Sequence, residues 1–131
     1  MDTAVSITVS DAQPIEVPWN PGMNVQQALE ATYNRVENAN VFSFAIEFFG
    51  TYQSLPYGPL GYMVVMLNGT YDLPDQSQYW ALYINNIPAT KGVDNSFLNS
   101  GDSVLFLNEP YSEQKHSKSA VALRHKIQHT S

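Results

Sequence analysis

Residues 79–88 read Tyr-Trp-Ala-Leu-Tyr-Ile-Asn-Asn-Ile-Pro, which is the densest aromatic and β-branched run in the chain. Side chains of a strand alternate between its two faces, so Trp80 and Leu82 would share one face, and Tyr79 and Tyr83 the other. Both faces are apolar or aromatic, which predicts a central strand with the core on one side. The tyrosine-bearing face is then either half-buried or in contact with a ligand or a second domain.

Further strands are predicted on both sides of this run. The central strand would end at the turn pair Asn85-Asn86, because Pro88 cannot continue a ladder of hydrogen bonds. Alternating apolar and polar residues predict most of the other strands, and an unbroken apolar run predicts one buried strand. These strands cover residues 4–10, 15–19, 42–48, 63–67 and 104–107.

One amphipathic helix is predicted over residues 24–38. Asn24 is a favourable N-cap, and Gln27 follows three residues later, where its side chain can reach back to the cap. Apolar residues then recur at helical spacing from Val25 to Val36, while the opposite face is polar.

The order of these elements is two strands, one helix and then more strands, as in a β-grasp fold with the first hairpin beside the last strand. The predicted fold class is therefore α+β, with one helix packed on a small mixed sheet of about five to six strands. Residues 1–111 would form this β-grasp-like domain. Residues 112–131 are basic and polar, and we expect a flexible C-terminal tail with a short helix over residues 120–127.

The chain has 131 residues, enough for one domain, and its net charge of −6 is unevenly spread. Residues 1–111 carry a net charge of −9, and residues 112–131 carry +3. An acidic body argues against a nucleic-acid partner, because neutralising phosphates requires a basic face. The basic tail either docks on an acidic surface or is disordered, and we favour disorder.

Cysteine is absent, which excludes disulfides, thiolate zinc sites and cysteine nucleophiles. No run approaches the roughly 20 apolar residues that a membrane span requires. No signal peptide is visible at Met1-Asp2-Thr3. We therefore expect either a cytoplasmic protein or a mature form from which a signal was removed.

Four segments share a pattern with a known domain family. They contain a strand between two glycines, a Tyr-Trp strand, a Gly-Val pair and a Gly-Asp turn, at residues 61–69, 79–85, 91–93 and 98–106. Together they resemble the transcobalamin-like C-terminal domain, the DUF4430 family, and residues 22–29 are similar to the start of that family's helix. This chain departs from the pattern at Asn85-Asn86, where the family usually has an Asn-Gly turn.

The resemblance covers about residues 5–107 and implies a β-grasp-type domain that is usually found outside the cytoplasm. In the vertebrate cobalamin carriers, such a domain is the smaller of two that enclose the vitamin. Bacterial relatives occur alone or within surface and secreted proteins, mostly with no assigned function. The resemblance therefore implies a secreted protein and a cobalamin-type corrinoid as a ligand.

The candidate binding site is an aromatic platform formed by Tyr62, Tyr79, Trp80 and Tyr83. Such a platform suits a flat ligand such as a corrin ring or a sugar, because aromatic rings offer a large contact area at low entropic cost. Tyr52 and Tyr57, in the loop over residues 50–62, would form a flap over it. The alternative, which is commoner for apolar stripes, is that Trp80 belongs to the core and the tyrosines only cover a sheet face.

The three histidines all lie in the C-terminal segment. His125 and His129 are spaced to share one face of a helix, and His116 could join them. Two histidines alone make a weak metal site, so no metal site is predicted.

Several polar residues are interpreted as parts of turns. Asp72 and Asp75 lie in a loop with a proline and are predicted to be solvated. Gly101-Asp102 is interpreted as a turn in which the aspartate caps backbone N–H groups. Asn68-Gly69-Thr70 fits a glycosylation sequence, but Asn-Gly is also a favoured tight turn, and we favour the turn.

No nucleophile elbow, phosphate-binding loop or dinucleotide fingerprint occurs in the chain. The histidines lie in a tail, a poor place for a preorganised base. The sequence therefore predicts a non-enzymatic module that binds a small molecule, with a corrinoid as the first candidate. The alternative is a protein–protein interaction or cell-surface adhesion module that uses a sheet edge or the tyrosine face.

Overall fold

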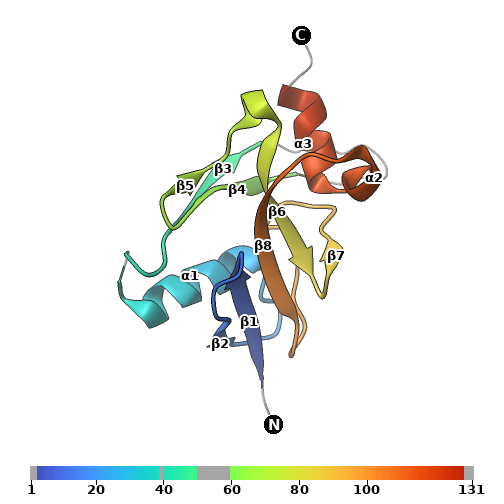
Figure 1. Cartoon of the computed structure of the whole chain (residues 1–131). Coiled ribbons are helices and arrows are strands. Elements are labelled where there is room, and N and C mark those ends of the chain that lie inside the picture. Colours follow the sequence, from blue (N-terminus) through green and yellow to red (C-terminus); the bar gives the residue numbers. More distant parts are fainter. Residues whose placement is uncertain (1–2, 39, 50–59, 129–131) are drawn as a thin grey trace.

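The computed structural model describes residues 3–38, 40–49 and 60–128 (Figure 1). Five strands form one mixed sheet, in which β1 pairs with β8 in parallel and the other neighbouring strands are antiparallel. The first hairpin lies beside the last strand, which confirms the predicted β-grasp-like arrangement and the α+β class. Across the sheet the strands are β2 (Ile15–Pro18), β1 (Ala4–Val9), β8 (Ser103–Pro110), β6 (Gln78–Ile84) and β7 (Ile87–Pro88).

Three further strands form a second, antiparallel sheet, where the sequence predicted a single sheet. They are β3 (Phe44–Phe48), β4 (Tyr62–Leu67) and β5 (Thr70–Tyr71), and the short helical turn η1 (Pro74–Gln76) follows them. β4 and β6 belong to different sheets and contact each other through side chains. Val64 of β4 lies in one hydrophobic core, and Met63 lies in another.

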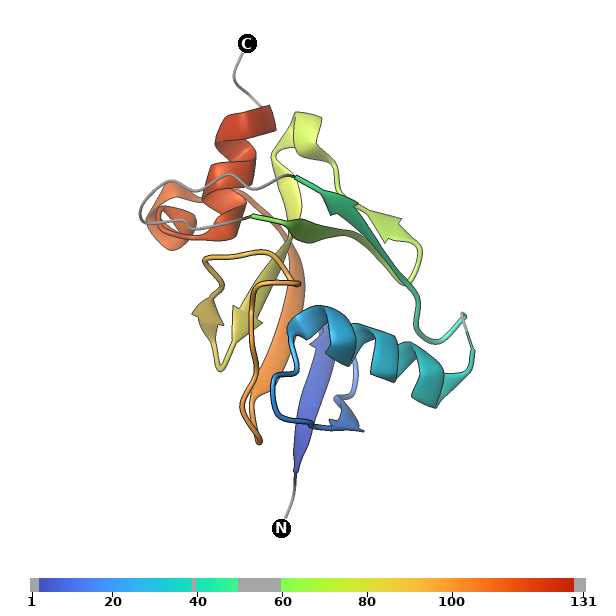
Figure 2. The same cartoon turned by 180° about the vertical axis from the view of Figure 1, so that it is seen from behind.

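The helix α1 (Val25–Val36) crosses the side of the large sheet formed by β1 and β2 (Figure 2). Its start confirms the predicted capping box: the Asn24 side chain accepts a hydrogen bond from the Gln27 backbone N–H, and the Gln27 side chain accepts one from the Asn24 N–H. The helix ends at Glu37, which has a left-handed backbone. Its buried residues Val25, Ala28 and Leu29 pack in the larger hydrophobic cluster, which also contains Trp80 and Leu82 and which we name the main core.

The turn after β6 has both asparagines in the left-handed region, with φ of 52° at Asn85 and 68° at Asn86. Two residues with positive φ suit the type I′ turn of a tight hairpin, and asparagine tolerates this region better than most residues. The chain therefore turns back at once, and Pro88 pairs with Tyr83 in β7. The prediction that Pro88 ends the pairing was wrong, because β7 is an edge strand, where proline is tolerated.

Both faces of β6 are buried, each in a different core. Trp80 and Leu82 lie in the main core with α1, whereas Tyr79, Ala81 and Tyr83 lie in a second core. The period-two alternation of a single strand thus supplies side chains to two separate apolar clusters.

The C-terminal segment covers the second core, and this differs from the flexible tail that we expected. It forms α2 (Glu113–His116) and α3 (Ala120–Gln128), which lie beside β6 in Figure 1. Four consecutive residues of α3, Ala120 to Leu123, are buried against Tyr79, Tyr83 and their neighbours. A sheet face that is aromatic needs an apolar cover, and these residues provide it. No helix among the described residues is long and apolar enough to cross a membrane.

A partly buried polar cluster attaches α2 to the large sheet. Glu109 on β8 accepts hydrogen bonds from the Tyr83 hydroxyl and, at 2.7 Å, from His116 Nε2. Its other oxygen accepts one from Lys115 Nζ at 3.2 Å. The opposite ring nitrogen of His116 accepts a hydrogen bond from the Ser112 N–H at 3.3 Å, so the ring is held from both sides. The carboxylate of Glu109 thereby connects β6, β8 and α2.

Because of this cluster, we expect acidic pH to weaken the attachment of α2 to the sheet. Burial would raise the pKa of Glu109, but hydrogen bonds from Tyr83, Lys115 and His116 outweigh burial and hold that pKa below its usual value of 4.5. A lowered pKa in the folded state stabilises the fold above the unfolded-state pKa, and this contribution is lost as the pH falls from about 4.5 through the folded-state value. Glu109→Gln should therefore be less stable than wild type at pH 7, and the difference should shrink below pH 4.5.

The measurement is urea unfolding at a series of pH values between about 7 and 3. Glu16→Gln serves as the control, because Glu16 is exposed on β2 and should differ little from wild type at any pH. A stability difference for Glu109→Gln that does not change with pH would contradict this account of the cluster.

Candidate ligand-binding site

The four residues of the predicted aromatic platform do not form one surface. Tyr79 and Tyr83 lie on the same, second-core face of β6, with Ala81 between them and α2 and α3 over them, and both are buried. Trp80 lies on the opposite face, in the main core, where its indole N–H donates a hydrogen bond to the Thr70 carbonyl at 2.8 Å. Tyr62, on β4, is 36% exposed and contacts Phe48, with the ring centroids 4.9 Å apart.

The tyrosine face is occupied by the chain's own C-terminal side chains. The hydroxyl of Tyr79 lies 3.3 Å from His125 Nδ1, and the hydroxyl of Tyr83 lies 3.2 Å from His116 Nε2. His125 also stacks on Tyr111, with ring centroids 4.1 Å apart and planes 8° from parallel. A ligand can reach this face only if α2 and α3 move away. The predicted flap residues Tyr52 and Tyr57 lie outside the described residues.

Asp72 was predicted to be solvated, and this is wrong. Its side chain is buried, accepts a hydrogen bond from the Trp80 backbone N–H at 2.9 Å and forms an ion pair with Arg124. The local sequence resembles a turn, but the segment lies under α3, which arrives from the far end of the chain.

The histidines do not converge as a metal site would require. The polar partners of His116 are Tyr83 and Glu109, whereas His125 lies against the Tyr79 hydroxyl, and the ring of Tyr111 stacks against both histidines. The predicted partner His129 lies outside the described residues. Within the part of the chain that the structure describes, no group of three His, Cys, Asp or Glu residues could hold a metal ion.

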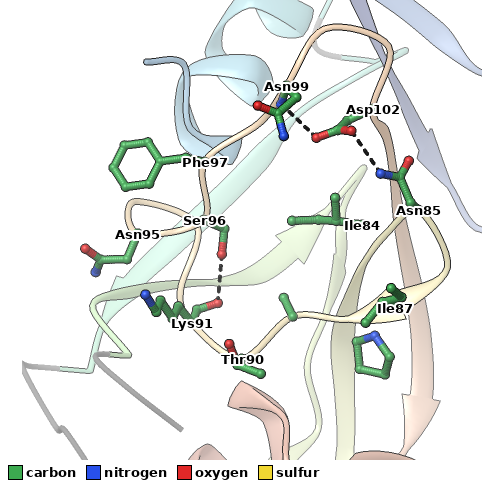
Figure 3. A pocket seen from close by; sticks show the side chains of 12 residues that line it. Ile84, Asn85, Ile87, Thr90, Lys91, Asn95, Ser96, Phe97, Asn99 and Asp102 are labelled. Carbon is green, nitrogen blue, oxygen red and sulfur yellow. Dashed lines mark hydrogen bonds between the residues drawn. The ribbon is translucent and has the colours of Figure 1, made fainter. Parts of the chain in front are cut away.

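An open groove of about 480 Å³ lies between the β6–β7 turn and the loop over residues 89–102. Figure 3 shows Ile84 pointing from β6 toward the middle of this groove, with Asn85 and Ser96 on opposite sides. This volume is within the usual range for small-molecule sites. We name this hollow the loop groove; its lining also includes Ile87, Pro88, Thr90, Lys91, Asn95, Phe97, Asn99 and Asp102.

The rim of the loop groove is held by the carboxylate of Asp102. One oxygen accepts a hydrogen bond from the Asn99 N–H at 2.8 Å, and the other accepts one from the side-chain amide of Asn85 at 2.9 Å. The side-chain oxygen Oδ1 of Asn85 in turn accepts a hydrogen bond from the Ser103 backbone N–H at 2.9 Å. These bonds join the β6–β7 turn to the 98–102 turn (Figure 3) and confirm the predicted capping role of Asp102.

Apart from Lys91 and Asp102, the lining of the groove is apolar or polar and neutral. Ile87 is 67% exposed and Phe97 is 63% exposed, unusually high for large apolar side chains. Asn95, Asn99 and Thr90 add amide and hydroxyl groups to the same lining. Such a surface suits an uncharged ligand that has both apolar area and hydrogen-bonding groups.

The loop groove was not predicted from the sequence. Its residues come from the β6–β7 hairpin and from the irregular segment that follows it, and no periodic pattern links the two. The available signal was an isolated pair of large apolar residues, Ile87 and Phe97, each within a polar stretch that also contains several asparagines.

The family model for DUF4430, a domain of unknown function, matches residues 22–109. Among solved structures, the chain is similar to haptocorrin in complex with Cbi (cobinamide), with a TM-score of 0.65 and 17% identity over 86% of this chain and 26% of that chain. It is also similar to a candidate metal-binding protein from Ruminococcus gnavus ATCC 29149, with a TM-score of 0.52 and 14% identity over 82% of this chain and 96% of that chain. No curated protein matches it in sequence. These likenesses show the fold, and the chain spans about a quarter of the haptocorrin chain.

The rim bonds predict that Asp102→Ala destabilises the protein. The substitution leaves the Asn99 N–H and the Asn85 amide without their charged acceptor. Hydrogen bonds to a charged group contribute more than neutral ones, so we expect a loss of about 2 kcal/mol in the free energy of unfolding, measured in urea.

The control for this substitution is Asp11→Ala, in the exposed turn after β1, which should change stability by less than about 0.5 kcal/mol. Equal stability of the two variants would show that the carboxylate of Asp102 does not hold the rim.

Proposed function

Because this chain belongs to the DUF4430 family, we propose that it is a non-enzymatic module that binds a small molecule in the loop groove, with a corrinoid as the first candidate. The observation that carries the proposal is the pair of exposed apolar side chains, Ile87 and Phe97, in a groove that also presents neutral amides and a hydroxyl. An apolar surface of this kind, rimmed by polar groups, is typical of a binding surface.

A corrinoid fits this chemistry better than a small charged metabolite does. Its macrocycle is flat and largely apolar, and its periphery carries amide groups that can exchange hydrogen bonds with asparagine and threonine side chains. The haptocorrin structure contains Cbi and shares this fold, which supports the ligand class. The groove is open, so the module would contact one side of such a ligand and would bind it weakly when alone.

The absence of catalysis is part of the same proposal. Lys91 and Asp102 are the titratable residues of the groove lining. Both oxygens of Asp102 already accept rim hydrogen bonds, so this carboxylate is poorly placed to move protons. The family resemblance further supports a site of action outside the cytoplasm.

Two sets of residues compete for the role of binding surface. The first is the loop groove. The second is the originally predicted set of Tyr62, Tyr79, Trp80 and Tyr83, of which the two β6 tyrosines become accessible only if α2 and α3 leave. Variants of the two sets distinguish them.

The test is a titration of the full chain with cobinamide and with cobalamin, followed by tryptophan fluorescence and calorimetry. We expect saturable binding that falls about tenfold in Phe97→Ala, since the loss of an aromatic contact is worth about 1–1.5 kcal/mol. Phe48→Ala is the matched control, because Phe48 is similarly exposed but lies outside the groove.

Each alternative has its own signature in this titration. Binding that is lost in Tyr83→Ala and Tyr62→Ala but kept in Phe97→Ala would move the site to the tyrosine face. The lack of both heat and quenching with either corrinoid would remove the corrinoid as ligand, and binding partners would then be sought among proteins.

A further inference from the structure

Arg124 on α3 enters a narrow slot in the body of the domain. Its guanidinium lies over the rings of Phe49 and Tyr79, 5.0 Å from each ring centroid. Nη2 pairs with the carboxylate of Asp72, and Nη1 donates a hydrogen bond to the Val64 carbonyl at 3.3 Å. Two ring faces, one carboxylate and one carbonyl thus surround one planar cation. We name these four groups the arginine slot.

The slot belongs to the family domain, whereas the arginine does not. The four groups of the slot come from the end of β3, from β4, from the β5–η1 connection and from β6, all within the matched residues 22–109. Arg124 comes from the segment that follows this match. Asp72 is also positioned without Arg124, because its other oxygen accepts the Trp80 N–H and its own N–H donates to the Val65 carbonyl at 2.9 Å.

The buried carboxylate of Asp72 makes the slot favourable for a cation. The side chain of Arg124 is 0% exposed and that of Asp72 is 4% exposed. Burial lowers the pKa of Arg124 to about 10, so the guanidinium remains charged at neutral pH but loses hydration on entering the slot. A buried carboxylate without its partner is costly. A planar guanidinium also stacks between two rings in a way that a rounded ammonium group does not.

We propose that the arginine slot is a recognition site of the domain, which Arg124 fills in cis and which an arginine-bearing helix of another polypeptide fills in trans. The expected partner is a short helix in which small apolar residues precede the arginine, as Ala120 to Leu123 precede Arg124 in α3. The charge distribution favours such a partner, since residues 1–111 carry −9 and the C-terminal segment carries +3. This site is separate from the loop groove and does not rest on its function.

The first experiment asks whether the slot binds guanidinium by itself. Arg124→Ala in the full chain removes the cation and should lower Tm by about 10 °C, because it leaves Asp72 buried and unpaired. Ethylguanidinium at millimolar concentration should recover a few degrees of this loss and leave wild type unchanged. Ethylammonium and the exposed-site variant Arg35→Ala are the controls for charge and for loss of an arginine.

The second experiment supplies the helix in trans. A fluorescent peptide with the sequence of residues 113–128 is titrated into the Arg124→Ala chain and into wild type, beside a peptide in which its arginine is glutamine. We expect the arginine peptide to bind the variant at least about tenfold more tightly than the glutamine peptide does. It should bind wild type more weakly, because α3 competes in cis.

The outcomes separate the two halves of the proposal. Equal effects of ethylguanidinium and ethylammonium overturn guanidinium recognition. Recovery of Tm by ethylguanidinium with no preference between the peptides overturns the helical partner. If Arg124→Ala does not fold, Arg124→Lys takes its place, because it keeps a positive charge beside Asp72 but lacks the planar guanidinium. Equal binding of the two peptides to that variant overturns the proposal.

Discussion

A strand that is apolar on both faces has to be covered twice, and β6 imposes this constraint on the rest of the molecule. Trp80 and Leu82 need a cover on one side, which the main core and α1 supply. Tyr79 and Tyr83 need a cover on the other side, and α2 and α3 supply it. The second sheet contributes to both cores through β4, with Val64 and Leu67 in the main core and Met63 in the second core. The two-core architecture therefore follows from the alternation within one strand of seven residues.

The elements that the sequence predicts best are those that short-range rules determine. The capping box of α1, the turn at Asn85-Asn86 and the alternating strands each depend on a few neighbouring residues, and the structure contains all of them. The β-grasp order follows from these elements together with chain topology. The split into two sheets depends on packing between distant segments, which no local pattern encodes.

The candidate site was harder to predict for a related reason. The tyrosines of β6 look like a binding surface in the sequence, because nothing near residues 79–83 indicates that residues 120–124 will cover them. The basic and polar composition of the C-terminal segment predicted a flexible tail. Its apolar residues, however, lie together in one turn of α3 and cover the tyrosines. Asp72 shows the same effect, since its partner Arg124 lies 52 positions away. No periodic pattern in the sequence marks the residues of the loop groove. Only the high exposure of Ile87 and Phe97 in the structure indicates it.

The parallel pairing of β1 with β8 has a consequence for biosynthesis. Ser6 lies opposite Ser103, so β1 pairs with β2 early, and its other edge is filled only after the residues up to β8 have been synthesised. Contacts this distant in sequence slow folding, and an open strand edge can pair with neighbouring nascent chains. During translation the growing chain therefore exposes this strand edge until β8 has been synthesised.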